Sequence, residues 1–193
     1  MCHKEFLCLV LLLWAASPSL YAKQSPYVGV ERCTRCHNDP PFGPVPIWSK
    51  GPHAKAFNRL LSPAAKKIAA QQGIKAPEKA MACLVCHSTA PGLKKRSTGR
   101  GLRLSEGISC EACHGPGKKY AKFAVMTKIA MLRLRKPKKA AIEAKKFGLL
   151  FQGSKSCARC HSPKVVFRGV TYVNPTYRPL AIEASLVKIR HWQ

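Results

Sequence analysis

The clearest periodic pattern of apolar and polar positions lies between residues 118 and 147. Phe123, Met126, Ala130 and Leu134 recur at the spacing of one helix face, and most positions around them are basic or polar. Pro137 interrupts this pattern, because proline lacks the N–H group that a helix interior needs. We therefore expect an amphipathic helix with its apolar face in the core, ended by Pro137 and followed by a second segment over residues 138–148.

Shorter helices are expected on both sides of this region. Ser62 and Pro63 predict a helix start, since serine caps helix N-termini and proline suits the first helical position. Gly73 would end that helix. A helix over residues 47–61 is expected before it, and a terminal helix is predicted by the spacing of Ile182, Leu186 and Ile189.

Two stretches lack helical periodicity. Residues 39–46 contain four prolines, which stop helices and favour extended backbone. Residues 165–177 are rich in β-branched and aromatic residues, but Gly169 and Pro175 interrupt them, so we expect extended chain without a regular strand. The whole pattern predicts a mainly α protein with a low content of regular secondary structure.

An unbroken apolar run covers residues 6–16. Lys4 precedes it and the small residue Ala22 follows, as in a secretory signal peptide. The run is also shorter than the roughly 20 apolar residues of a spanning helix. We expect a cleaved signal peptide over residues 1–22, one domain over residues 23–193, and no spanning segment in the mature chain.

Four copies of the motif Cys-x-x-Cys-His carry the candidate chemistry. Two thiols three residues apart can form thioether bonds to one porphyrin, while the adjacent imidazole binds its iron. The sequence therefore predicts four covalent haem c groups. The haem-binding cysteines would be Cys33, Cys36, Cys83, Cys86, Cys110, Cys113, Cys157 and Cys160, and the iron ligands His37, His87, His114 and His161.

Paired cysteines also occur in zinc sites and disulfides. A zinc ribbon joins two pairs into one tetrahedral site and does not need a histidine after every second cysteine. Cys2 and Cys8 would leave with the signal peptide, and the other eight of the ten cysteines make four complete motifs. Because haem c is attached outside the bacterial cytoplasmic membrane, the motifs and the predicted export both indicate the periplasm.

Four large apolar groups change what the core of so short a chain consists of. Only 171 residues, 23 to 193, remain after the predicted cleavage. Much of this chain would wrap porphyrin instead of packing on itself. We therefore expect the fold of a multihaem cytochrome c, with helices joined by long loops and little regular sheet.

The net charge of +26 is large for 193 residues. Haem propionates would lower it to about +18, which is still enough for long-range attraction of acidic partners. Acidic redox proteins are the partners we expect, with the basic face of residues 118–147 as the leading docking surface; the alternative is that this face is simply solvated. Such a charge also occurs in nucleic-acid-binding proteins, but an exported haem protein does not meet nucleic acid, so we expect none.

Histidines available as sixth iron ligands are scarce. Outside the motifs the mature chain contains only His53 and His191, so at most two irons can bind a second histidine. The other irons would be open, or would bind methionine, lysine or a residue of a partner. Met126, Met131 and Lys118 are the candidates within the chain.

The ligand count bears on function. Haems with two histidine ligands have no open position and can only move electrons, so we expect an electron carrier and not an enzyme. The alternative is a reductase that binds a small nitrogen-oxide ligand at an open haem, but acidic residues near the first two motifs are scarce. A third possibility is a subunit whose missing ligands come from a larger complex.

Three stretches carry a resemblance to a known family. They are residues 28–37, 48–56 and 106–117, and with the four motifs in order they resemble the tetrahaem cytochrome c that accepts electrons from hydroxylamine oxidoreductase in ammonia oxidisers. The resemblance covers about residues 26 to 163. It implies haems stacked in pairs, first with third and second with fourth.

The resemblance also implies iron ligands. His53 would bind the third haem and His191 the fourth, while the second haem would be five-coordinate. The family carries a histidine for the first haem shortly after its Cys-His-Gly-Pro-Gly run, whereas this chain has residues 118–122, Lys-Lys-Tyr-Ala-Lys. The first haem would then be five-coordinate or bound by lysine or methionine.

Overall fold

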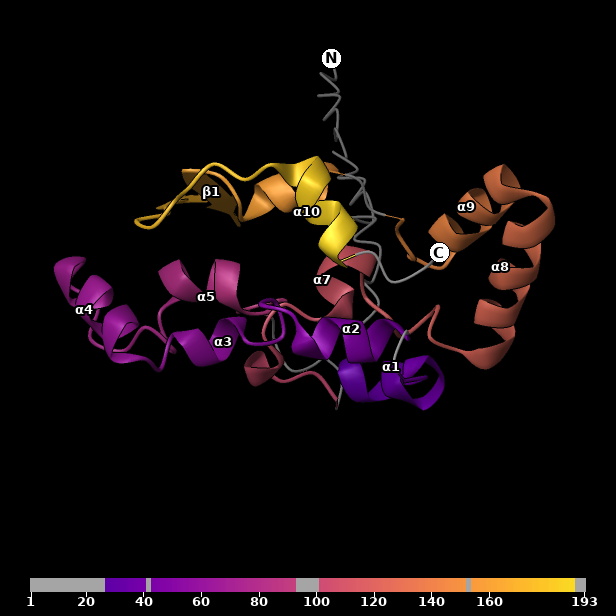
Figure 1. The fold of residues 1–193 in the computed structure, drawn as a ribbon, viewed down its shortest axis with the longest axis horizontal. Coiled ribbons are helices and arrows are strands. Elements are labelled where there is room, and N and C mark those ends of the chain that lie inside the picture. Colours follow the sequence, from indigo (N-terminus) through magenta and orange to yellow (C-terminus); the bar gives the residue numbers. More distant parts are fainter. Residues whose placement is uncertain (1–26, 41–42, 93–100, 152–153, 190–193) are drawn as a thin grey trace, which may run out of the picture.

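The computed structural model describes residues 27–40, 43–92, 101–151 and 154–189 (Figure 1). Short helices joined by long loops make up most of it, which confirms the mainly α fold with little sheet. The α-helices are α1 (Val30–His37), α2 (Pro44–Lys50), α3 (Ala56–Arg59), α4 (Pro63–Gln71), α5 (Met81–His87), α7 (Cys110–His114), α8 (Phe123–Arg135), α9 (Pro137–Lys146) and α10 (Ile182–Ile189). The remaining elements are the 3-10 helices η1 (Leu104–Glu106) and η2 (Ser154–Arg159) and the strands β1 (Lys164–Phe167) and β2 (Val170–Val173).

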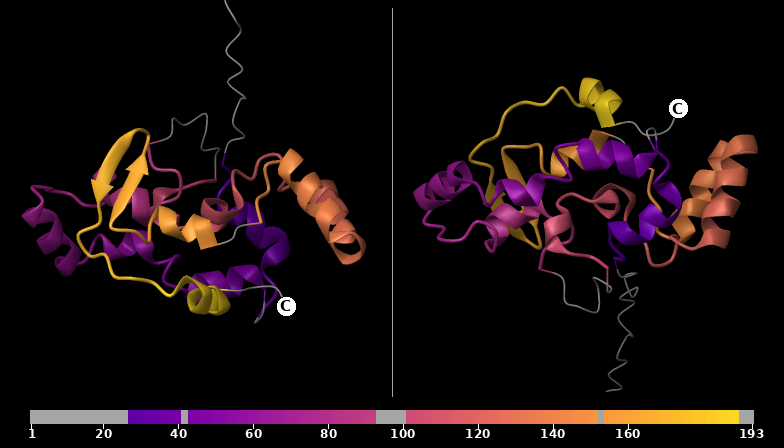
Figure 2. Two further views of the ribbon diagram at one scale, coloured as in Figure 1. Left: turned by 90° about the horizontal axis from the view of Figure 1, so that it is seen from above. Right: turned by 60° about the horizontal axis from the view of Figure 1, so that its bottom comes forward.

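Helices α8 and α9 form a hairpin that we call the basic hairpin, residues 123–146. It stands at one end of the molecule, and α4 lies at the other (Figures 1 and 2). The predicted break at Pro137 is confirmed, because Pro137 is the first residue of α9. Eleven of the basic residues lie between residues 118 and 146, with Glu143 as the single acidic residue among them.

The expected core face of α8 is wrong. Phe123 and Leu134 are 81% and 82% exposed, whereas the residue buried on this helix is Ile129. Ile129 packs with Tyr120, Ala144 and Leu149 in a small apolar cluster between the two helices. Of the predicted stripe, only Met126 packs against this cluster, and part of the stripe borders the cavities described below.

The predicted helix over residues 47–61 is also wrong. Helix α2 already begins at Pro44, inside the stretch expected to be extended, and ends at Lys50. Pro44 fits there because the first helical residue makes no N–H bond within the helix. Pro52 disfavours helical backbone at Gly51, whose ψ is 165°, so the helix stops and α3 begins only at Ala56.

The helix predicted from Ser62 is confirmed. Its N-terminus is capped by the Ser62 hydroxyl, which accepts a hydrogen bond from the Ala65 N–H at 3.2 Å. Gly73 follows the helix with a φ of +70°. The terminal helix is confirmed as α10.

Residues 164–173 form a real antiparallel hairpin, where we expected no regular strand. Strand β1 pairs with β2 from Lys164 with Val173 to Phe167 with Val170. The two residues between the strands are Arg168 and Gly169, with φ of +53° and +78°. Positive φ at both positions is the geometry of a tight two-residue turn. Gly169 therefore closes a hairpin and does not interrupt a strand.

Helix α7 lies near the middle of the molecule, and a buried carboxylate joins it to the start of the described chain (Figure 1). Glu111 is 2% exposed and accepts hydrogen bonds from the backbone N–H groups of Val28 at 2.9 Å, Gly29 at 2.8 Å and Gly117 at 2.6 Å. Burial raises the pKa of this carboxyl, while the backbone hydrogen bonds lower it. Hydrogen bonds to the Glu111 carboxylate thus join the segment before α1 to the chain after α7.

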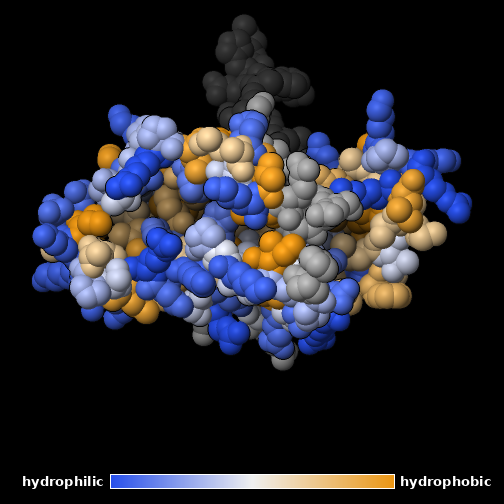
Figure 3. Space-filling view, viewed as in Figure 1, coloured by the Kyte–Doolittle hydropathy of each residue, from blue (hydrophilic) through white to orange (hydrophobic). Residues whose placement is uncertain are grey.

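The exterior is mainly hydrophilic, with separate apolar patches on the face seen in Figure 3. In the part of the chain that the structure describes, no helix combines the length and the apolar character needed to cross a bilayer. The predicted signal peptide, residues 1–22, lies outside the described residues.

Replacing Glu111 with glutamine should destabilise the fold. The new amide nitrogen would face backbone N–H donors, because each of the two carboxylate oxygens now accepts from them. Leaving a buried donor unpaired costs about 1–3 kcal/mol. We expect a lower midpoint in guanidinium unfolding of the haem-loaded protein.

The matched control is Glu31→Gln on α1, which removes the same charge from an exposed side chain. An equal midpoint for the two variants would show that the Glu111 hydrogen bonds do not stabilise the fold.

Candidate functional site

Helical backbone brings the three reactive groups of each motif together. In α1, Cys36 and His37 lie three and four positions after Cys33, and residues at these two spacings share one helix face with the first residue. Helices α5 and α7 present the second and third motifs in the same way. The fourth motif begins in η2 with Cys157 and ends in the turn after it.

The thiols of the motifs lie together in two pairs. The Cys33 thiol of the first motif lies close enough to interact with the Cys110 thiol of the third, and the Cys86 thiol of the second with the Cys160 thiol of the fourth. These contacts, together with burial, raise the pKa of the Cys33 and Cys86 thiols. The motifs are therefore adjacent in the pairs that the resemblance implies, first with third and second with fourth.

Further contacts join the two pairs. Arg159 of the fourth motif donates a hydrogen bond from Nη2 to the Ala112 carbonyl of the third at 2.6 Å. Burial raises the pKa of the Cys113 thiol, and the nearby thiol of Cys157 in the fourth motif raises it further. The four motifs thus form a row in the order first, third, fourth, second.

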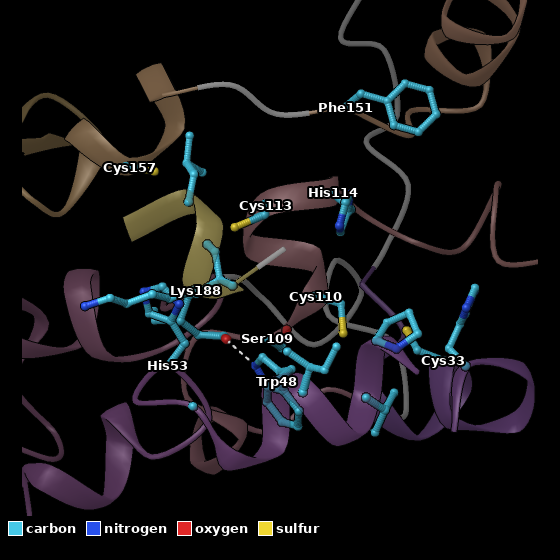
Figure 4. Close-up of a pocket in the computed structure, with 18 of the residues that line it drawn as sticks. Cys33, Trp48, His53, Ser109, Cys110, Cys113, His114, Phe151, Cys157 and Lys188 are labelled. Atoms are coloured by element: carbon cyan, nitrogen blue, oxygen red, sulfur yellow. Dashed lines mark hydrogen bonds between the residues drawn. The ribbon is translucent and has the colours of Figure 1, made fainter. Parts of the chain in front are cut away.

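Two cavities adjoin this row. The larger, of about 500 Å³, is bordered by residues of the first, third and fourth motifs and by α10, and its lining is mainly apolar (Figure 4). The smaller, of about 280 Å³, lies between the first motif and the start of α8. Five residues border both cavities: Cys33, His37, Tyr120, Met126 and Ala130.

Two motif histidines are oriented by backbone carbonyls. The Nδ1 atom of His87 lies 2.7 Å from the Ala56 carbonyl oxygen, and that of His114 lies 3.0 Å from the Leu150 carbonyl oxygen. A carbonyl oxygen only accepts, so each Nδ1 carries the proton and donates it. A backbone carbonyl at Nδ1 is the usual partner of a metal-binding histidine, whose Nε2 then binds the metal.

His53 is held beside the third motif by backbone contacts. Its carbonyl oxygen accepts a hydrogen bond from the Ile108 N–H at 3.0 Å, and the Trp48 indole donates to the Ile108 carbonyl at 2.8 Å (Figure 4). Gly107 permits this approach, because a Cβ there would lie 2.6 Å from the His53 oxygen. The segment before α7 thus fixes where the His53 ring lies.

His53 borders the larger cavity together with residues of the first, third and fourth motifs. Its ring centroid is also 6.1 Å from that of His161, the histidine of the fourth motif. Burial and the charge of His161 lower the pKa of His53, which favours the neutral imidazole that binds metals. His53 therefore lies between the third and fourth motifs.

The other predicted ligands are placed differently. His191 lies outside the described residues. Lys118 and Met131 do not border either of the two cavities, whereas Met126 borders both. Sequence reasoning missed Glu111 as a structural residue, although it lies inside a motif. A buried carboxylate whose partners are backbone N–H groups 83 and 82 residues away has no sequence signal.

The arrangement fits covalent haem and not a zinc ribbon. None of the eight cysteines from Cys33 to Cys160 forms a disulfide. Within the described ranges, no group of three or more His, Cys, Asp or Glu side chains is arranged to hold a metal ion directly. Paired thiols, oriented imidazoles and large apolar cavities are instead the surroundings that a thioether-linked porphyrin requires.

Comparisons with known proteins agree with this chemistry. Residues 32–115, which contain the first three motifs and His53, match the family described as cytochrome c554 and c-prime. Cytochrome c-554 of Nitrosomonas europaea is 30% identical over 145 residues, which are 72% of this chain and 59% of that protein. The chain thus spans less than two thirds of this relative's length.

A solved structure shares the fold. The reduced state of cytochrome c554 from Nitrosomonas europaea matches with a TM-score of 0.53 at 22% identity, over 86% of this chain and 78% of that chain. At this identity the match concerns the fold, which in both proteins is mainly helical with little sheet.

Replacing Cys83 and Cys86 together with alanine should remove one haem. Without thiols at the second motif no thioether bond can form there, so the intact mass should fall by one haem while three remain. Intact-mass spectrometry and a pyridine haemochrome assay would measure this. Alanine at Cys2 and Cys8, in the predicted signal peptide, should leave the haem count at four, and an unchanged count in the Cys83 and Cys86 variant would contradict the assignment.

Proposed function

Because the chain is a relative of the cytochrome c554 and c-prime family and carries four haem c groups, we propose that it transfers single electrons between redox partners. A haem iron that alternates between ferrous and ferric states supplies the one-electron chemistry. The cysteines of the four motifs would attach the porphyrins, and the motif histidines would bind the irons. His53 and His191 would be second ligands.

The row of motifs is the observation that carries this proposal. Transfer over several sites needs each site to lie next to the following one. Thiol contacts join the first motif to the third and the fourth to the second, and Arg159 joins the third to the fourth. Nothing comparable would be needed by a protein that binds one ligand at one iron.

Export to the periplasm is part of the proposal. It is supported by the predicted signal peptide over residues 1–22, which would leave a domain of residues 23–193, and by the haem motifs. The charge supports acidic redox proteins as partners, since complementary charge accelerates encounter.

The basic hairpin offers the strongest local charge for such a partner. Lys138, Lys139 and Lys145 of α9 are exposed. Lys128 and Lys146 are instead engaged with Glu143, whose carboxylate oxygens they contact at 2.5 and 3.1 Å. The hairpin adjoins the first motif across the smaller cavity, so a partner bound there would be at one end of the row.

Reductive titration of the purified, haem-loaded protein tests the function. We expect uptake of four electrons per chain and full reoxidation by ferricyanide, without consumption of nitrite, nitric oxide or hydroxylamine. Catalytic turnover of any of these three would instead favour the reductase alternative. That alternative rests on the lack of histidine ligands for two irons.

Charge reversal on the basic hairpin tests the docking surface. The variant Lys138→Glu with Lys139→Glu should slow electron transfer from hydroxylamine oxidoreductase, used as the probe donor, by roughly tenfold at low ionic strength. The difference should vanish at high salt, which screens exposed charges. Stopped-flow absorbance of the haems would measure the rates.

The control variant is Lys66→Glu with Lys67→Glu on α4, which makes the same charge change at the other end of the molecule (Figure 1). Equal slowing by the two variants would show that net charge matters and that the hairpin is not a specific docking surface.

A further inference from the structure

Among the described residues around the first motif, one side chain is best suited to bind an iron from the far side. Five residues border both cavities, and Cys33 and His37 among them belong to the motif itself. Ala130 has no donor atom. Tyr120 is buried and its hydroxyl donates a hydrogen bond to the Gly115 carbonyl at 2.7 Å. Of the five residues that border both cavities, this leaves Met126, whose thioether sulfur can bind iron.

The position of Met126 is fixed by the helix that carries it. Ile129, three residues later, is 3% exposed and packed against Tyr120, Ala144 and Leu149, which sets the rotation of α8. Met126 is half-buried against the same cluster. Ala130, one turn after Met126, lies on the same helix face and leaves room beside it.

The other two methionines that the structure describes, Met81 and Met131, border neither cavity. Met81 is in α5, two residues before the second motif, and its methyl carbon packs against Gly92. A Cβ added to Gly92 would lie 2.6 Å from that carbon. Met131 is 54% exposed and lies five residues after Met126, about 140° around the helix.

Lysine is less suited to the position. Lys122 borders the smaller cavity but not the larger one, and its side chain is exposed. A lysine ammonium has no lone pair and must lose a proton before it can bind iron. A thioether needs no deprotonation.

We propose that Met126 is the sixth ligand of the first haem iron, opposite His37. The assignment rests on the proposed function, since it requires haem at the first motif. Methionine in place of histidine raises the reduction potential of a haem. The first haem, next to the basic hairpin, would then have a higher reduction potential than it would have with a second histidine ligand.

The test uses the exported, haem-loaded protein and two variants of the same helix, Met126→Ala and Met131→Ala. The oxidised wild type should show the weak near-infrared absorption of a methionine sulfur bound to ferric haem. Met131→Ala should keep this absorption. Met126→Ala should lose it and gain a high-spin signal in electron paramagnetic resonance, with all four haems still present by intact mass.

A third variant, Met126→His, covers the case in which alanine at this position prevents folding. This variant should lose the sulfur absorption and have a lower reduction potential at one haem. Every iron that is low-spin in the wild type should stay low-spin. The assignment would be overturned if the sulfur absorption persisted in both Met126 variants or were absent from the wild type. It would also be overturned if a new high-spin signal appeared in Lys122→Ala and not in Met126→Ala. A first motif that carries no haem would overturn the proposed function as well.

Discussion

The buried carboxylate of Glu111 is the contact on which the arrangement of the motifs depends. It lies inside the third motif, yet it binds backbone N–H groups that precede the first motif and one that follows the third. Burying a carboxylate is costly unless its oxygens are satisfied, so the two chain segments cannot move away from it independently. The side-by-side position of Cys33 and Cys110 follows from this constraint.

The second constraint is the lack of a large protein core. The described apolar cluster between α8 and α9 contains four buried residues, and large apolar side chains such as Phe123 and Leu134 are exposed. In an ordinary domain such a face would pack on a neighbouring element. Here Phe123 and Met126 border the smaller cavity beside the first motif. An apolar stripe that looks like a core face is thus better understood as a wall of a haem site.

Charge and geometry act at the same end of the molecule. The basic hairpin packs on itself through Ile129 and binds its one acidic residue, Glu143, between two lysines. Its inner side borders the first motif, and its outer lysines face solvent. An acidic partner attracted to this hairpin would therefore meet the first motif before the other three, which makes the ligand of the first haem important for the direction of transfer.

The sequence by itself determined the chemistry, because covalent attachment depends on residues a few positions apart. The four motifs, the cap at Ser62 and the break at Pro137 are all local signals, and a local signal survives whatever the rest of the chain does. The sequence misplaced the apolar face of α8, since periodicity shows that a face is apolar but not what covers it. It also missed the β-hairpin turn at Arg168 and Gly169.

Only the tertiary structure decided that the two pairs of motifs join into one row, that His53 lies between the third and fourth motifs, and that Met126 and not Met131 borders the cavities beside the first. These relations join residues that are far apart in the chain. They depend on backbone hydrogen bonds and on the rotation of α8, and neither of these two causes leaves a pattern in the order of the amino acids.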